Sequence, residues 1–252
     1  MSIKIKRKKI SIILILALIG GTMVGCGQSD TKKEGPVQIK MEKYIKDAYK
    51  EDFVVEVPIM HRDEGGISNY DNAVAYPKKD KSLKFEIDYR GGKFSDNYMD
   101  VKWSREGSPI VGNRLREVYG ENTKYDFELT EEINENTKKM NYKEVTENYP
   151  DKGAIRLVYY VFLDGSLDKQ KEGERAYDIL KTTILDNKIK EYLFTVFFVD
   201  RKYKDLIMNN KIDYEMLDND DLYKSKKLVN GIYSTELSNV RNKDDLIKRF
   251  RY

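Results

Sequence analysis

The loop from His61 to Gly66 holds the residues whose types and spacing best suit chemistry in this chain. His61 with Asp63 or Glu64 has the groups to ligate a metal ion, or to act as a general base whose ring a carboxylate orients. A single imidazole beside charged loop residues is more often a solvated surface residue, and we favour this second interpretation. The loop therefore stays a candidate site without an assigned reaction.

Counting residue types excludes most familiar sites. The chain has 1 Cys and 1 His, which excludes a disulfide framework and any zinc site built from several such ligands. It has no phosphate-binding loop, no dinucleotide-binding glycine motif and no G-x-S-x-G nucleophile motif. The 43 Asp and Glu residues contain many pairs that would suit a glycoside hydrolase, so no single pair stands out. We therefore predict no catalytic residue, no metal site and no cofactor.

Residues 1–25 have the three parts of a secretory signal peptide. A basic stretch that ends at Lys9 precedes an apolar run from Ile10 to Val24, and small residues lie near the end of that run. The run has 15 residues, whereas a helix that crosses a bilayer needs about 20. A cleaved signal is therefore favoured over a transmembrane anchor.

Cys26 directly follows this segment. Met23-Val24-Gly25-Cys26 resembles the lipobox of bacterial lipoproteins. The resemblance implies that the signal is cut before Cys26 and that Cys26 becomes the acylated first residue. The rest of the chain would then face outside, anchored by the lipid to the outer leaflet of the cytoplasmic membrane. The alternative is a secreted protein that carries a stray thiol and no lipid.

The residues that follow Cys26 agree with the hypothesis of a lipid-anchored exported protein. Residues 26–36 are polar and unpatterned, which predicts a flexible tether. Three stretches, Tyr76-Pro77, Leu83–Tyr89 and Lys93–Tyr98, resemble segments of uncharacterised exported lipoproteins from low-GC Gram-positive bacteria. That resemblance implies a location and no activity.

The charge distribution argues against a nucleic-acid partner. Residues 1–25 carry five basic side chains and no acidic one, and the rest of the chain has 41 basic and 43 acidic residues. A nucleic-acid binder needs a clustered positive field, which this balance does not provide. The aromatic residues, which include 19 Tyr and 1 Trp, are ample for a core. Trp103 lies in a helical stretch, where core packing is more usual than stacking on a sugar.

Hydrophobic patterning after the tether predicts an α+β fold with a mixed or antiparallel sheet and packed helices. Alternating residues predict strands with one wet face over 83–89 and 125–129. A short strand is expected near 72–76, and Pro58 favours an edge position for a strand over 53–60. Residues 155–163 and 192–199 are apolar on both faces, which predicts two central strands joined by a crossover helix. Further helices are expected over 37–52 and from Asp200 to Met208. Another helical region is expected after Gly91-Gly92, with a break at Gly107 and a new helix start at Ser108-Pro109.

The two halves resemble each other faintly. Each has a strand, a glycine turn, a helix and a second strand, which suggests two related subdomains over residues 37–135 and 136–252. Chance similarity among such segments is the alternative. Residues 211–252 show only weak patterning.

These observations favour a binding protein over an enzyme. We expect a lipid-anchored extracytoplasmic module that binds another envelope protein or the cell wall. Two alternatives stay open: a cell-wall hydrolase that uses unidentified carboxylates, and a small solute-binding lipoprotein.

Overall fold

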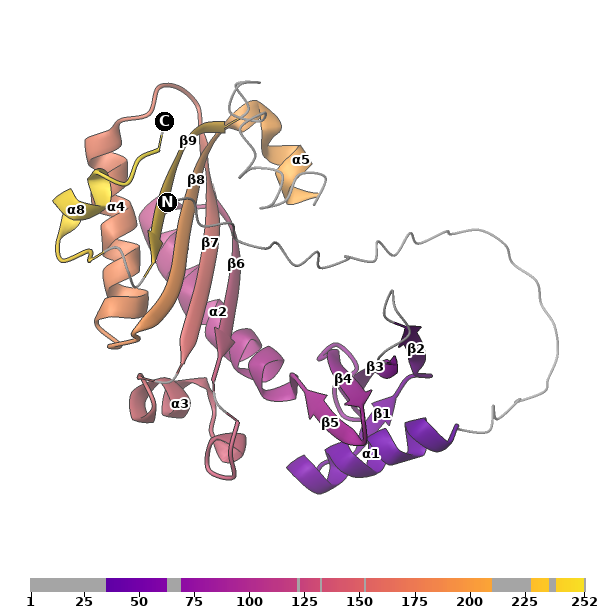
Figure 1. Cartoon of the computed structure of the whole chain (residues 1–252). Coiled ribbons are helices and arrows are strands. Elements are labelled where there is room, and N and C mark those ends of the chain that lie inside the picture. The colour runs from indigo at the N-terminus through magenta and orange to yellow at the C-terminus, as the bar shows by residue number, and fades with distance from the viewer. Residues whose placement is uncertain are drawn as a thin grey trace, which may run out of the picture. The chain divides into compact units, whose positions relative to one another are not determined.

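The computed structural model describes residues 35–62, 69–121, 123–131, 133–151, 153–209, 228–235 and 239–251. They form two β-sheets with helices packed against them (Figure 1), which confirms the predicted α+β fold. The proposed signal peptide, Cys26 and most of the proposed tether lie outside the described residues.

Sheet A is antiparallel and contains the first five strands. Strands β1 and β2 both pair with β3, which is followed by β4 and β5 in the order of the sheet. The strand bounds are β1 Phe53–Val55, β2 Ile59–Arg62, β3 Asn69–Pro77, β4 Phe85–Arg90 and β5 Lys93–Asp96. Within the described part of the chain β1 and β2 form one edge of the sheet, as predicted. The prediction of a single strand over 53–60 was wrong because the chain leaves the ladder around Pro58, which has no N–H to donate.

The local sequence explains how sheet A forms. Phe85 and Ile87 are buried and Glu86 is exposed, so β4 has the predicted apolar and wet faces. Gly91 and Gly92 have φ angles of 57° and 85°, and they supply the positive φ values that a tight turn between β4 and β5 needs. Helix α1, Pro36–Tyr49, buries Met41 and Ile45 one turn apart and agrees with the predicted first helix.

Sheet B contains the remaining four strands in the order β6-β7-β8-β9. Their bounds are β6 Thr123–Thr130, β7 Ala154–Leu163, β8 Glu191–Asp200 and β9 Leu228–Thr235. The central strands β7 and β8 are parallel, and α4, Lys169–Leu180, extended by a π-helical turn over Lys181–Leu185, connects them. The predicted central strands and crossover helix are therefore confirmed. In Figure 1, α2 and α4 lie on one face of this sheet.

Helix α2, Tyr98–Tyr119, is continuous, so the predicted break at Gly107 was wrong. Pro109 lies inside this helix. Gly107 does not end the helix but lets it approach two aromatic rings: a Cβ there would lie 2.5 Å from Tyr142 Cε2 and 2.7 Å from Phe127 Cε1. The glycine is a packing residue that resembles a helix breaker in the sequence.

Helix α2 contributes to the packing of both sheets. At its N-terminal end the Tyr98 ring lies 5.1 Å from the Phe53 ring of sheet A. At its C-terminal end the Tyr119 ring lies 5.9 Å from the Tyr159 ring of sheet B. One hydrophobic core includes residues of both sheets and of this helix.

Short helices complete the described part of the chain. Their bounds are η1 Thr137–Lys139, α3 Tyr142–Asn148, η3 Arg201–Tyr203, α5 Lys204–Met208 and α8 Lys243–Ile247. Asp200 caps the start of the helix predicted up to Met208, because its Oδ1 accepts a hydrogen bond of 3.0 Å from the Lys202 N–H. Strand β9 and helix α8 fall in the C-terminal region where the sequence patterning was weak.

The proposed subdomain boundary at residues 135 and 136 lies between β6 and β7, which pair with each other in sheet B. Glu34–Tyr252 forms one compact unit. In the first of the two similar segments, β4 and β6 belong to different sheets, whereas in the second β7 and β8 are neighbours in one sheet. The two segments thus have different strand pairings.

Candidate functional site

His61 lies in β2 and not in the loop that the sequence suggested. Its half-buried ring stacks on the Tyr70 ring at a centroid distance of 4.8 Å and an interplanar angle of 16°. The Arg90 guanidinium lies 4.4 Å from the centroid of the same tyrosine ring. Asp63 and Glu64, the other two members of the candidate, lie outside the described residues. The geometry therefore describes a stack across β2, β3 and β4, and no reaction is assigned to it.

The described ranges contain no group of three or more His, Cys, Asp and Glu residues that is arranged to hold a metal ion. Trp103, the other residue considered for binding, is 0% exposed, and its Nε1–H donates a hydrogen bond of 2.9 Å to the Met140 carbonyl. It is a core residue, as the sequence predicted.

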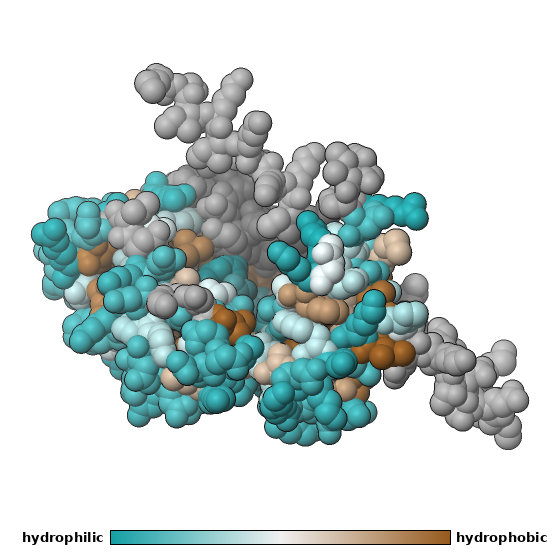
Figure 2. Space-filling model, turned by 60° about the horizontal axis from the view of Figure 1, so that its bottom comes forward, coloured by the Kyte–Doolittle hydropathy of each residue, from teal (hydrophilic) through white to brown (hydrophobic). Residues whose placement is uncertain are grey.

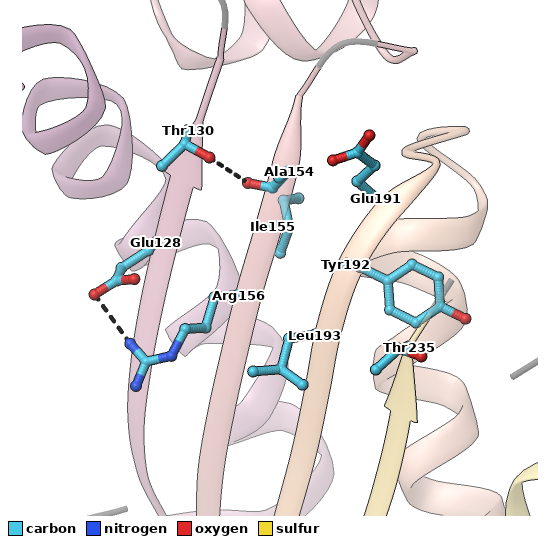
Figure 3. A pocket seen from close by; sticks show the side chains of 9 residues that line it. All are labelled: Glu128, Thr130, Ala154, Ile155, Arg156, Glu191, Tyr192, Leu193 and Thr235. Carbon is cyan, nitrogen blue, oxygen red and sulfur yellow. Dashed lines mark hydrogen bonds and ion pairs between the residues drawn. The ribbon is translucent and has the colours of Figure 1, made fainter. Parts of the chain in front are cut away.

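A hollow on sheet B, here called the Arg156 hollow, gathers polar groups that the sequence analysis did not single out (Figure 3). It has a volume of about 380 Å³ and lies where β6 and β9 end and β7 and β8 begin. All four strands of the sheet contribute residues to it. A volume of this size accommodates a small ligand or one side chain of a partner.

Strand register explains why these residues meet. Glu128 pairs with Arg156, Arg156 with Leu193, and Leu193 with Thr235, so these four residues form one row across the sheet. Neighbouring residues of each strand point to the opposite face. Phe127 and Leu129 accordingly pack into the core beneath, whereas Glu128 is exposed.

Arg156 is the electrostatic centre of the hollow. Its Nη1 lies 2.9 Å from Asp126 Oδ2 and 2.9 Å from Glu128 Oε1. Partial burial lowers the pKa of Arg156, but the two carboxylates outweigh it and raise that pKa above its usual value. On the neighbouring strand, the exposed Glu191 forms no ion pair with any other described residue. The lining of the hollow thus has two carboxylates, those of Glu128 and Glu191, and one guanidinium, which leaves it with an excess of negative charge.

The same face of the sheet becomes apolar beyond this row. Tyr160 and Phe197 stack at 5.5 Å, and Tyr233 meets Phe197 edge-on at 5.6 Å. These rings belong to a second hydrophobic cluster, which also includes Ile207 of α5. The Arg156 hollow is therefore the polar end of a sheet face whose other end is a hydrophobic core.

The side chains that line the hollow suit a polar ligand. They include the Thr130 and Thr235 hydroxyls and the Glu191 carboxylate, a mixture that orients a polar ligand by hydrogen bonds.

Asp100, in the first turn of α2, belongs to a separate polar cluster. Its Oδ1 accepts a hydrogen bond of 3.4 Å from the Glu131 N–H. Nearby, Asp96 accepts hydrogen bonds from the Tyr44 hydroxyl at 2.7 Å and the Tyr49 hydroxyl at 2.9 Å. Burial, together with the negative charge of Asp96, raises the pKa of Asp100 to about 6. The cluster joins α1, β5 and α2, and it contains a carboxyl that titrates near physiological pH.

This titration predicts a pH-dependent stability. Between about pH 4 and pH 6 the folded state holds a proton on Asp100 that the unfolded state has lost, so stability falls as the pH rises through this range. The variant Asp100→Asn stays neutral and keeps an oxygen for the Glu131 N–H. We expect it to be more stable than the wild type by about 1 kcal/mol near pH 7.5 and equally stable near pH 4.

Urea unfolding of both proteins at the two pH values measures this difference. The matched control is Asp47→Asn, on the exposed side of α1, which we expect to have the same small effect at both pH values. An Asp100→Asn effect that does not change with pH would contradict the assignment of the titration to Asp100.

Few large hydrophobic residues are exposed on the described surface. In the view of Figure 2 hydrophilic residues dominate, and hydrophobic residues form small separate areas. The exposed large hydrophobic side chains are those of Ile39, Val57, Ile59, Met60, Ile110 and Met208. Three of these lie within four residues of each other around Pro58, at the edge of sheet A. Among the described helices, none combines the length and the apolar character that crossing a membrane requires.

Comparison with known proteins gives no functional assignment. No protein-family model matches the chain, and no curated protein matches it. Among solved structures, the chain is similar to a DUF5037 family protein from Ruminococcus gnavus ATCC 29149, with a TM-score of 0.43 and 15% sequence identity. That similarity covers 86% of this chain and 94% of the other. The chemistry of the site therefore rests on its own residues.

Proposed function

We propose that this protein is a lipid-anchored extracytoplasmic binding module, whose partner is another envelope protein or the cell wall. The observation that carries the proposal is the position of Cys26, directly after an apolar segment and within Met23-Val24-Gly25-Cys26. Helix α1 begins at Pro36, ten residues later. A short polar connection of this kind holds a domain near a membrane surface while leaving its faces accessible.

The Arg156 hollow is the contact site that we propose for the partner. It supplies charge and hydrogen-bonding groups on a rigid sheet, and polar groups placed in this way give orientation and specificity.

In-cell crosslinking of the full-length protein tests both parts of the proposal. A photoreactive amino acid is placed at Glu191 in the hollow, at Ile59 on the edge of sheet A, and at exposed Lys248 as a control. We expect one reproducible product from position 191, which Arg156→Met abolishes and which is an envelope protein or a wall fragment. A mass spectrum of the recovered protein should show a mature chain that starts at an acylated Cys26, and the variant Cys26→Ala should lack this form.

Each other outcome overturns a named part of the proposal. A product from position 59 alone would place the contact on sheet A, and no product from any position would reject a binding module. A mature chain that starts elsewhere than at Cys26, or a Cys26 without acyl groups, would reject the lipid anchor. The two alternatives have their own readouts: a hydrolase releases dye from labelled wall, and a solute-binding protein gains thermal stability with a small ligand.

A further inference from the structure

Ala154 is the smallest side chain that lines the Arg156 hollow, and it lies between two polar ones. Thr130 pairs with Ala154, and Ala154 pairs with Glu191, so these residues form a second row across the sheet (Figure 3). Each lies two positions along its strand from a member of the row described above, so both rows are on one face. Neighbouring strands lie about 4.8 Å apart, so the backbones of Thr130 and Glu191 are separated by roughly 10 Å. Only a methyl group stands between these two side chains.

Oxygen atoms that accept hydrogen bonds lie on both sides of that methyl group. The Thr130 hydroxyl donates to the Ala154 carbonyl at a distance of 3.5 Å, so the lone pairs of its oxygen stay available. On the other side, the exposed Glu191 carboxylate has acceptor oxygens and receives no donor from any described residue. This part of the hollow therefore suits a group that brings its own donors.

Two basic residues close to Glu191 in the sheet have other partners. Arg156 is held by the two carboxylates described above, at 2.9 Å each. Lys190 precedes Glu191 in the chain, and its Nζ lies 2.7 Å from Asp151 Oδ1. The negative charge of Glu191 is thus not neutralised within the described part of the chain.

An exposed carboxylate in water is well hydrated and requires no counterion. Glu191, however, lines the concave surface that we propose as the contact site, and a partner that covers this surface removes the water. A carboxylate that loses its water is stabilised by a cation or by hydrogen-bond donors. A partner that binds here must therefore supply one of them to Glu191.

We propose that the partner is a protein that inserts a lysine side chain into the Arg156 hollow, with the ammonium group between Glu191 and Thr130. This inference rests on the function proposed above. An ammonium group has three donors, which can point to acceptors on two different strands, whereas the planar fork of a guanidinium suits a single carboxylate. The hydrocarbon stem would lie over Ala154, and the volume of about 380 Å³ holds such a side chain.

A photoreactive amino acid at Leu193, in the adjoining row, tests this inference in cells while Glu191 stays intact. We expect its product to contain one envelope protein, with a yield that falls at least about threefold in Glu191→Gln, which removes the charge and keeps the shape. The matched control Glu147→Gln removes an exposed charge from α3 and should leave the yield unchanged. Equal thermal unfolding of both variants and the wild type excludes a folding defect as the cause. A photoreactive residue at position 191 lacks the same charge, so its product should be weaker than that from position 193.

Carbodiimide treatment of the membrane fraction gives a second readout. This reagent activates a carboxylate, an amine in contact with it then forms an amide, and the reagent leaves as a urea. We expect an amide between Glu191 and a lysine of the captured protein. The variant Glu191→Lys should lose the photoproduct, and replacing that lysine of the partner by glutamate should restore it.

The failure of this inference differs from the failure of the proposed function. A protein captured equally well by the wild type and Glu191→Gln, or one that forms no amide with Glu191, overturns the lysine contact and leaves the binding module in place. A wall fragment in place of a protein has the same meaning. No product from any position overturns both.

Discussion

Replacing Trp103 by alanine is expected to lower the free energy of unfolding by about 4 kcal/mol. The indole is 0% exposed, so its loss leaves a large cavity between α2 and the segment that follows η1. It also leaves the Met140 carbonyl without the hydrogen bond that Trp103 Nε1 donates. A buried carbonyl that loses its donor adds to the cost of the cavity.

Urea unfolding followed by far-ultraviolet circular dichroism measures this loss, because the chain has 1 Trp and the substitution removes the natural fluorescence probe. The matched variant is Trp103→Phe, which keeps most of the apolar volume and loses only the N–H. We expect about half of the alanine effect for this variant. If Trp103→Ala changed the stability by less than about 1 kcal/mol, this residue would not be part of a packed core.

Replacing Gly107 by alanine is expected to destabilise the protein by about 2 kcal/mol, although alanine is the better helix former. In an unobstructed helix the substitution would stabilise by up to about 1 kcal/mol. Here the added methyl group would lie 2.5 Å from Tyr142 Cε2 and 2.7 Å from Phe127 Cε1. Both rings are buried, so they move aside only by disturbing the core.

The control for this prediction is Gly165→Ala, where a Cβ would meet no atom within 4 Å. We expect that variant to differ from the wild type by less than about 0.5 kcal/mol in the same urea titration. A Gly107→Ala protein as stable as the wild type would mean that α2 does not approach Tyr142 and Phe127 this closely.

Local patterns predicted the strands because burial alternates with a period of two. Phe127 and Leu129 are buried and Glu128 is exposed, as the alternation requires. The continuity of α2 was not predictable in the same way, because Ser108-Pro109 has the local features of a helix start. Gly107 precedes this pair because it lets α2 approach the rings of Tyr142 and Phe127, which are distant in the sequence.

The Arg156 hollow could not be predicted from local sequence patterns, because strands that are distant in the sequence form it. The alternating pattern placed Asp126 and Glu128 on the wet face of a strand. Arg156, however, lies in the segment 155–163, which was interpreted as apolar on both faces. Their contact follows from the pairing of Glu128 with Arg156, which is set by strand register in the whole sheet. Strand β9 was missed for a related reason: Gly231 interrupts its pattern, and in the fold a Cβ on Gly231 would lie 2.7 Å from Tyr233 Cε2.

Helix α2 packs against both sheets, so its apolar face is buried in two stages as the chain is synthesised. The core that contains Leu115 of α2 also contains Ile232 of β9 and Leu246 of α8. A chain that emerges from its N-terminus can complete sheet A early, but the C-terminal half of α2 then waits, with its apolar face uncovered, for strands made much later. The apolar face of such a newly made chain favours aggregation until β9 and α8 cover it.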